Sequence, residues 1–373
     1  MMMIQNVELN AICPYYTMYP LSFAQVALRT VRAGGAVLDP FCGRGTTAFA
    51  ARTRRLKSFN VDISPVAVAI TEAKLADVKP QAIIAEARRL LAEYDPDPAP
   101  EGAFWDLAYH SETLKLILRL RRGLREADAG DGGIPARIAL RGVLLGALHG
   151  PIPKTKHSYL SNQMMRTFAP KPAYSVRFWT ARGMQPPQVD VLAVVAERAA
   201  RYYAPPLVAP AGAAVLGDAR KLRPEMLPWE NIRFDAVVTS PPYWGMSTYL
   251  PDQWLRAWLL GGPSSPDYKI GEQIAQKSKE AFCEGLAEVW QRAAELCNPG
   301  ARLAIRFGGL PSQYCDPKAL LRRSLELAGG AWKITRIRQV AAPTGNSRQA
   351  MQMAERCRST PMSEIDVFCR LTL

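Results

Sequence analysis

The sequence is poor in the side chains that most often bind metals or form disulfides. It has only three histidines in 373 residues, and its seven cysteines are scattered without a Cys-x-x-Cys pair. An odd, dispersed set of cysteines argues against a disulfide framework and supplies no zinc ligands. So few histidines also argue against a histidine-centred metal site. We therefore expect free thiols in a reducing compartment and no metal.

Long apolar runs and acidic residues are scarce as well. No stretch approaches the ~18 consecutive apolar residues of a transmembrane helix, and residues 1–10 lack the layout of a signal peptide. The 33 acidic residues face 47 Lys and Arg, which gives a formal charge of +14. This excess favours nucleic acid as a partner over an anionic membrane surface. We expect a cytoplasmic protein without a membrane partner, nucleoid-associated if the source is a prokaryote.

Strand and helix patterns alternate near the start of the chain. A short apolar run ends at Asp39, and a glycine turn leads into a helix expected over 46–55. A second strand, over 58–61, ends at Asp62, and another helical pattern follows. This order of strand, tight loop and helix is typical of the opening of a parallel α/β domain.

The middle of the chain differs in character. Residues 76–211 show helical periodicity broken by Pro- and Gly-rich stretches, which predicts a mostly helical insertion into an α/β domain of 1–75 and 212–373. The later strands are expected at 213–216, 234–239, 301–307, 332–340 and 364–371, with the last two as an antiparallel pair.

A glycine loop follows the first strand. Gly43-Arg-Gly-Thr-Thr-Ala48 fits the pattern G-x-G-x-x-A, a weak sign of dinucleotide binding, and Asp62 lies at a suitable distance for a ribose-binding acid. The loop lacks the Gly-Lys-Ser/Thr ending of a P-loop, which argues against ATP. A turn that serves only the strand-to-helix geometry is the plain alternative.

Three acidic residues, Asp39, Asp62 and Asp218, follow the ends of three expected strands. Ligands of open α/β sheets bind at the carboxyl ends of the strands. A carboxylate at Asp39 would repel a pyrophosphate but suits the ammonium group of S-adenosylmethionine. Asp62 would then accept hydrogen bonds from the ribose, and Asp218 from the adenine amino group. The set therefore favours S-adenosylmethionine over NAD or ATP.

A second motif, Ser240-Pro-Pro-Tyr243, directly follows the strand expected at 234–239. Its two prolines stiffen the backbone and remove two N–H donors. The Ser240 hydroxyl and the Pro241 carbonyl can accept both hydrogens of an exocyclic –NH2, and Tyr243 offers a face for stacking a base. Holding both hydrogens favours a tetrahedral nitrogen whose lone pair can attack a sulfonium methyl group.

Together, Asp39-Pro-Phe-Cys-Gly-Arg-Gly45 and Ser240-Pro-Pro-Tyr243 resemble the motifs of the amino-methylating DNA methyltransferases, which modify cytosine N4 or adenine N6 with S-adenosylmethionine. The resemblance covers about 1–75 and 212–373. It implies a Rossmann-like methyltransferase sheet, mostly parallel with an antiparallel strand near the C-terminus, and a helical insertion as candidate target-recognition region. It implies no metal.

The resemblance also implies roles for individual residues. The implied catalytic residues are Ser240, Pro241, Pro242 and Tyr243. The implied cofactor-binding residues are Tyr19, Pro20, Asp39, Pro40, Phe41, Cys42, Gly43, Gly45, Thr46, Asp62, Ile63 and Asp218. Serine as the first residue of the tetrapeptide favours cytosine N4 as the target and leaves adenine N6 open. Methylation at cytosine C5 is excluded, because it needs a cysteine nucleophile, typically after a proline, and the sequence has no Pro-Cys dipeptide.

Basic residues gather in two places. Between 141 and 188 there are seven basic residues and no acidic ones, interleaved with aromatic side chains, a mixture suited to phosphate contacts. We predict DNA contacts from Lys154, Lys156, Arg166, Lys171 and Arg177. A second basic set surrounds the late strands, where ordinary solvated charge is an equal alternative: Lys333, Arg336, Arg338, Arg348, Arg356 and Arg358.

The sequence thus predicts a site-specific methyltransferase that flips cytosine out of double-stranded DNA and methylates its N4 amino group. Three alternatives stay open: adenine N6 in DNA, a base amino group in RNA, and a nucleic-acid-binding protein with a vestigial cofactor site. A cognate restriction endonuclease is an optional partner.

Overall fold

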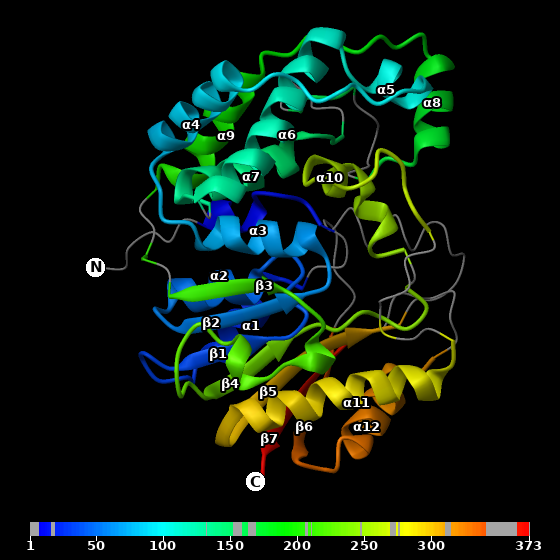
Figure 1. Cartoon of the computed structure of the whole chain (residues 1–373). Coiled ribbons are helices and arrows are strands. Elements are labelled where there is room, and N and C mark those ends of the chain that lie inside the picture. The colour runs from blue at the N-terminus through cyan, green and yellow to red at the C-terminus, as the bar shows by residue number, and fades with distance from the viewer. Residues whose placement is uncertain are drawn as a thin grey trace. The chain divides into compact units, whose positions relative to one another are not determined.

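The computed structural model divides into two compact units (Figure 1). The helical unit comprises 1–18, 64–210 and 248–270, and the sheet unit comprises 19–63, 211–247 and 271–373. The residues that the structure describes are 7–15, 19–131, 133–151, 159–162, 169–205, 208–209, 211–246, 248–268, 274, 277–309, 315–340 and 364–372.

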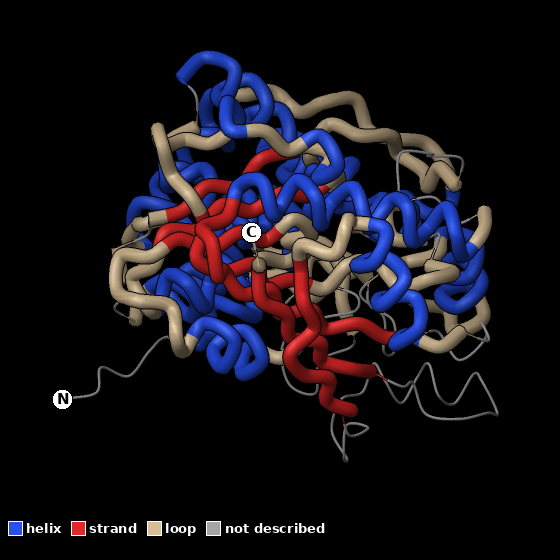
Figure 2. The backbone as a smooth tube through the Cα atoms, turned by 90° about the horizontal axis from the view of Figure 1, so that it is seen from below, coloured by secondary structure: helices blue, strands red, loops and turns tan. Residues whose placement is uncertain are grey.

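The sheet unit is built on seven strands in the order β3-β2-β1-β4-β5-β7-β6, drawn red in Figure 2. The strands are β1 (Ala36–Asp39), β2 (Lys57–Asp62), β3 (Gly212–Leu216), β4 (Phe234–Thr239), β5 (Cys297–Gly308), β6 (Trp332–Val340) and β7 (Glu364–Leu371). The first five pair in parallel, and β7 is antiparallel to both β5 and β6. The predicted fold class, a mostly parallel sheet with an antiparallel strand near the C-terminus, is confirmed.

Helices cover both faces of this sheet, which explains why the central strands are apolar along almost their whole length. On one face, α1 (Leu21–Leu28) and α2 (Thr46–Thr53) share a core with β1 and β4. On the other face, α11 (Lys279–Leu296) and α12 (Pro317–Leu327) pack into a larger core with the strands. Figure 1 shows both of these last helices on the same side of the sheet.

The antiparallel end of the sheet contains a buried ion pair. Arg306 on β5 donates two hydrogen bonds, of 2.7 and 3.0 Å, to the carboxylate of Asp366 on β7, and Asp366 is fully buried. The Arg306 guanidinium also lies 4.7 Å from the ring centroid of Phe23 on α1. Arg338 on β6 donates to the same carboxylate. One buried acid thereby connects the three strands β5, β7 and β6.

The helical unit holds the other helices, and its boundary differs from the division at 75/76 and 211/212 that the sequence suggested. Its elements are α3 (Pro65–Leu75), α4 (Pro80–Glu93), α5 (Ala103–Ala108), α6 (Ser111–Asp131), α7 (Pro135–Ala147), α8 (Pro172–Thr180), α9 (Val191–Tyr203) and α10 (Trp254–Leu259), with short 3-10 turns at Val7–Ala11 and Pro251–Gln253. The insertion is mostly helical as expected, but α3 and α10 from the flanking segments belong to the same unit.

Close packing explains why α3 groups with the insertion. A Cβ atom on Gly142 of α7 would lie 2.3 Å from the Cβ of Ala73, so only glycine allows α3 and α7 to approach this closely. Tyr203 on α9 donates to the Ala73 carbonyl at 2.7 Å. Likewise, Arg256 on α10 donates to the Leu145 carbonyl of α7 at 3.1 Å.

Replacing Asp366 with alanine tests the buried ion pair. Asp366→Ala leaves the Arg306 guanidinium buried without its carboxylate, so we expect a loss of about 3–5 kcal/mol in the free energy of unfolding. Urea unfolding measures this loss. The control is Glu295→Ala, because Glu295 pairs with Arg292 at 2.9 Å with both side chains about half exposed, and exposed pairs contribute only ~0–1 kcal/mol. Equal losses in the two variants would contradict the assignment.

Candidate functional site

The glycine loop joins β1 to α2 at the carboxyl edge of the sheet. Gly43 and Gly45 both have left-handed backbone angles, with φ of 50° and 72°, which glycine adopts without strain. Gly45 precedes the first residue of α2, and its N–H donates to the Cys42 carbonyl at 2.7 Å. A Cβ atom on Gly43 would meet nothing within 4 Å. There is therefore open space beside the loop, next to the first turn of α2.

Asp39, the last residue of β1, lies at the centre of a hydrogen-bond network. Its carboxylate accepts from the Thr239 hydroxyl at 2.7 Å and from the Tyr19 hydroxyl at 3.3 Å. It also accepts from the Phe41 N–H at 3.2 Å. Tyr19 hydrogen-bonds to Thr47 as well, and Thr47 donates to the Val238 carbonyl at 2.9 Å. The network therefore connects β1, β4, the segment before α1 and the first turn of α2.

Burial decides what Asp39 can do. Its side chain has no exposed surface, and burial raises the pKa of its carboxyl from the usual value near 3.8 to about 6. Hydrogen bonds from Thr239, Thr47 and Tyr19 act in the opposite direction. The direct contact with a ligand ammonium group, which the sequence suggested, stays a prediction. In this structure the oxygens of Asp39 are occupied by neighbouring groups of its own chain.

Asp62 and Asp218 follow the ends of the next two strands in the sheet. Asp62 closes β2 and accepts from the Gly43 N–H at 2.9 Å, so it fixes the glycine loop. Asp218 lies two residues beyond β3, and its two carboxylate oxygens accept from the Arg220 guanidinium at 2.7–3.0 Å. Hydrogen bonds and charge from Arg220 keep the pKa of Asp218 below its usual value, although burial opposes this. The three acids lie at one edge of the sheet, at or just beyond the ends of adjacent strands.

The other predicted cofactor residues surround the same loop. Tyr19, Pro40, Cys42 and Thr46 are buried, Phe41, Gly43 and Ile63 are half-buried, and Pro20 is exposed immediately before α1. The Phe41 ring meets Trp290 of α11 edge-on, with ring centroids 6.3 Å apart. The segment therefore presents backbone and small side chains at its surface, whereas most of its larger groups point into the core.

The tetrapeptide begins at the residue directly after β4. Ser240 and Pro242 are half-buried, and Pro241 is buried. Tyr243 is only 4% exposed, its ring meets Phe307 edge-on at 5.5 Å, and its hydroxyl donates to Glu364 at 2.8 Å. Burial raises the pKa of this phenol well above its usual value, and the Glu364 charge adds to the effect. The open face for base stacking expected at Tyr243 is therefore covered in this structure.

Sequence reasoning missed three residues of this site. Thr239 and Thr47 bond directly to the network around Asp39, and both stand inside or beside the motifs already recognised, so position was an available signal. Glu364 carried no such signal, because 121 positions separate it from Tyr243. Its place follows only from the antiparallel pairing of β7 with β5.

The predicted DNA-binding residues are only partly described. Lys154, Lys156 and Arg166 lie outside the described residues. Lys171 is exposed immediately before α8, and Arg177 is exposed on that helix. Their role in DNA binding stays a prediction.

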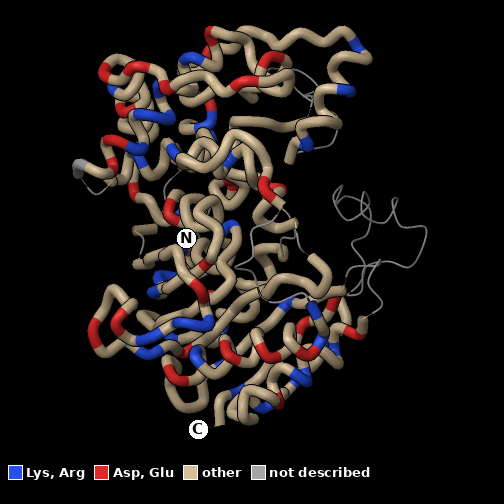
Figure 3. The backbone as a smooth tube through the Cα atoms, turned by 45° about the vertical axis from the view of Figure 1, so that its right-hand side comes forward, with Lys and Arg blue, Asp and Glu red and all other residues tan. Residues whose placement is uncertain are grey.

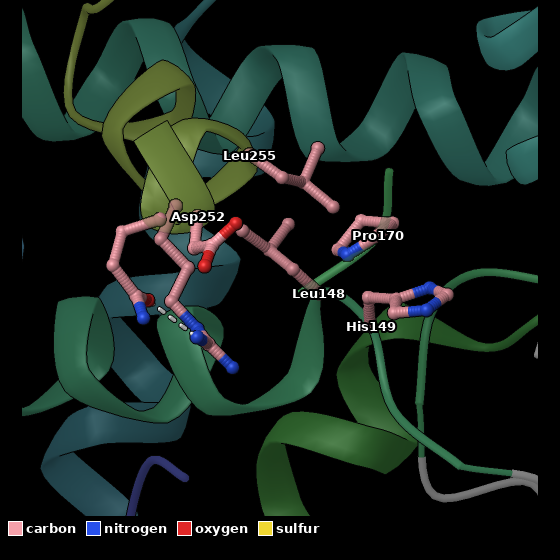
Figure 4. A pocket seen from close by; sticks show the side chains of 7 residues that line it. Leu148, His149, Pro170, Asp252 and Leu255 are labelled. Atoms are coloured by element: carbon pink, nitrogen blue, oxygen red, sulfur yellow. Dashed lines mark hydrogen bonds between the residues drawn. The ribbon is translucent and has the colours of Figure 1, made fainter. Parts of the chain in front are cut away.

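The helical unit contains a small cavity of about 10 Å³, lined by residues that include His149, Asp252, Leu255 and Arg256 (Figure 4). Such a volume holds about one water molecule. His149 is buried, and burial lowers its pKa to about 3, so its ring is neutral at pH 7. Its Nδ1 lies 2.7 Å from the Ser161 hydroxyl. The cavity is too small for a nucleoside or a cofactor.

Within the described part of the chain, no group of three or more His, Cys, Asp or Glu side chains is arranged to hold a metal ion. In the same residues no helix is both long enough and apolar enough to cross a membrane.

No protein-family model matches the chain, and no curated protein matches it. Among solved structures, TrmN from Thermus thermophilus matches with 13% identity and a TM-score of 0.35, covering 97% of this chain and 52% of TrmN, so this chain spans about half its length. The rRNA methyltransferase aviRa from Streptomyces viridochromogenes matches with 14% identity and a TM-score of 0.37, covering 98% of this chain and 93% of aviRa. A geranyl diphosphate methyltransferase bound to GPP and sinefungin matches with 9% identity and a TM-score of 0.36, covering 94% and 77%. At these scores the likeness says nothing about what this chain acts on.

The raised pKa of Asp39 gives a testable pH dependence. The folded protein holds the Asp39 proton up to about pH 6, whereas the unfolded chain releases it near pH 4. The stability that this group contributes is therefore fully present below about pH 4 and is lost as the pH rises through 6. Asp39→Asn does not titrate. We expect the free energy of unfolding of the wild type, relative to Asp39→Asn, to fall by on the order of 2–3 kcal/mol between pH 4 and 7.

Denaturant unfolding of both proteins across this range measures the difference. Because all other titrating groups are shared, they cancel in the comparison. Parallel stability curves for the two proteins would contradict a raised pKa at Asp39.

Proposed function

We propose that this chain is an S-adenosylmethionine-dependent methyltransferase that acts on the exocyclic amino group of a nucleic-acid base, with cytosine N4 in DNA as the preferred target and adenine N6 as the alternative. One observation carries the proposal. The tetrapeptide begins at Ser240, directly after β4. Thr239, the last residue of β4, donates a hydrogen bond to Asp39 at the end of the adjacent strand β1, where the glycine loop begins. Two motifs far apart in sequence thus meet at one edge of the sheet.

The residues at this edge fit the cofactor. The space beside Gly43 lies next to the first turn of α2, and Asp62 and Asp218 stand at the ends of the next two strands. The Asp62 carboxylate is suited to accept hydrogen bonds from the ribose hydroxyls. The Asp218 carboxylate is suited to accept one from the adenine amino group, which would then share this carboxylate with Arg220. Asp39 holds the shape of the glycine loop through the hydrogen bonds that it accepts from Thr239 and from the Phe41 N–H. When bound, S-adenosylmethionine supplies an electrophilic methyl group.

The tetrapeptide is suited to orient an amino group. Because Pro241 and Pro242 lack N–H groups, this part of the backbone presents acceptors without competing donors. The Ser240 hydroxyl and the Pro241 carbonyl would accept the two hydrogens of the –NH2 group and favour the tetrahedral nitrogen of the transition state. Positioning of this kind requires a nitrogen held in line with the methyl group in a site that excludes water.

Tyr243 sets a condition on base entry. Its ring is packed against Phe307, and its hydroxyl is held by Glu364. A Cβ atom on Gly308 would lie 2.9 Å from this ring, so a larger residue there would displace it. A flipped base would stack on the ring only after the ring leaves Phe307 and Glu364, so the stacking energy of ~1–3 kcal/mol would have to offset the loss of these contacts.

Methyl transfer to different acceptors tests the proposal directly. The protein is incubated with methyl-labelled S-adenosylmethionine and duplex DNA, single-stranded DNA or total RNA, and digested nucleosides are then separated. We expect label in N4-methylcytosine from duplex DNA. Label in N6-methyladenine would move the target to the alternative base, and label only in RNA would overturn the choice of DNA. Absence of label from every nucleic acid would overturn the proposed function.

Replacing Asp62 tests the cofactor site. Asp62→Asn keeps an acceptor for the Gly43 N–H but removes the negative charge, and a charged hydrogen bond contributes roughly 1.5–3 kcal/mol. We expect the affinity for S-adenosylmethionine, measured by calorimetric titration, to fall about ten- to a hundredfold. The control is Asp235→Asn, because Asp235 accepts from the Ala36 N–H at the opposite edge of the same strands. Equal affinities in both variants would remove the cofactor from this edge.

Replacing Ser240 separates chemistry from binding. Ser240→Ala removes an acceptor that matters most when the amino nitrogen becomes tetrahedral, so the single-turnover rate should fall by roughly fivefold, in line with about 1 kcal/mol for one hydrogen bond. The affinities for S-adenosylmethionine and DNA should stay unchanged. A variant with the wild-type rate would show that the reaction centre lies elsewhere.

A further inference from the structure

We propose that one face of the antiparallel end of the sheet binds the phosphate backbone of duplex DNA. This basic face is formed by exposed Arg and Lys side chains on β5, β7 and β6, namely Arg302, Lys333, Arg336, Arg338 and Arg370. The inference rests on the proposed function, since it concerns how the same substrate is held. It requires neither the helical unit nor the predicted contacts of the segment before α8.

Strand register places these residues on the same face. Arg302 on β5 lies directly opposite Arg370 on β7, and Lys333 on β6 lies opposite the same Arg370. Directly opposed residues of antiparallel strands point to the same side of the sheet. The three cations therefore form a row across three strands, at positions that are all exposed.

The next positions along the strands extend the row into a track. Arg336 lies opposite Phe368, and Arg338 lies opposite Asp366. Asp366 is already shared between Arg306 and Arg338, so it neutralises only one of them. Among the described residues, the other four cations, Arg302, Lys333, Arg336 and Arg370, have no carboxylate partner within 4 Å. Figure 3 marks all described Lys and Arg positions along the backbone in blue.

The arrangement costs stability unless an anion is bound. Like charges directly opposite one another on a sheet are destabilising, and this row sets three together without an acid between them. The other face of the same strands is apolar and packs against α11 and α12, so the cations are segregated from the core. A polyanion lying across the row would offset the repulsion, which identifies charge complementarity as the basis for recognition.

One end of these strands lies next to the candidate reaction centre. There, Glu364 on β7 lies opposite Gly308 on β5 and accepts a hydrogen bond from the Tyr243 hydroxyl. Along β6, the cations from Lys333 to Arg338 span five residue steps, or ~17 Å at 3.4 Å per residue. Since one strand of duplex DNA carries a charge every ~3.4 Å along the axis, this length matches roughly five phosphate spacings.

The chemistry of the face favours nucleic acid over other anionic partners. Phe368 is only half-buried but packs against Phe23, with ring centroids 6.4 Å apart, and Ala304 beside it is buried. Among the described residues of this face, the large side chain of Phe368 is therefore not free to enter a lipid bilayer. A row of cations backed by a rigid sheet suits a regular line of phosphates that needs no sequence readout.

The test compares two pairs of substitutions in the full chain. Lys333→Gln/Arg336→Gln removes one Lys and one Arg from the basic face. Lys318→Gln/Arg322→Gln removes the same charges from exposed positions on α12, which packs against the opposite face of the sheet. Binding of a duplex DNA and of an RNA of equal length is measured at several salt concentrations, and thermal unfolding confirms that both variants are folded.

We expect the slope of log affinity for DNA against log salt to become shallower by about 1.8 in the β6 variant, which is two lost contacts at about 0.9 each, and to change little in the α12 variant. Equal slopes in the two variants, or no binding of DNA by the wild type, would overturn the proposal. A shallower slope with RNA alone would replace DNA by RNA as the occupant.

Measuring methyl transfer by the wild type in parallel distinguishes a failure of this proposal from a failure of the proposed function. Methylated DNA together with equal salt slopes would overturn the basic face and leave the methyltransferase. A shallower slope without any methyl transfer would leave the basic face and overturn the methyltransferase.

Discussion

The candidate site depends on one buried carboxylate. Asp39 ends β1 with no exposed surface, yet it accepts hydrogen bonds from Thr239 on β4 and from Tyr19 before α1. Through Tyr19 it is also connected to Thr47 in the first turn of α2. Removing an acid of this kind from water is costly, and its donors compensate only in part, because its pKa remains raised to about 6. The glycine loop and the tetrapeptide are therefore held in register by the same group.

The antiparallel end of the sheet supplies a further residue to the candidate site from the other side of β4. Because β7 runs against β5, the start of β7 comes to the edge where β4 ends, and Glu364 meets the Tyr243 hydroxyl there. The reaction centre that we propose is thus enclosed by residues from three neighbouring strands. The ion pair of Asp366 with Arg306 keeps β7 in place two residues further along the strand.

Much of the fold was predictable because apolar or alternating strand patterns in the sequence are bounded by strong breakers. The residues of β4, β6 and β7 agree with the ranges expected from the sequence. Burial was not predictable, since nothing in the sequence shows whether an acid at a strand end, such as Asp39, faces solvent or core. The pairing of Tyr243 with Glu364 was hidden for the same reason. The boundary at α3 was missed because local patterns do not reveal that Ala73 packs against Gly142.

The sheet has two outer strands in its described part, and each carries a different defence against pairing with a second copy. An exposed strand edge is a template for aggregation, which proteins counter with charge or with short strands. At one end, β6 has exposed cations at Lys333, Arg336 and Arg338 among its nine positions. At the other, β3 has no charge and an exposed Leu216, but it is only five residues long. The positive charge of β6 therefore opposes edge-to-edge pairing with the same strand of a second copy.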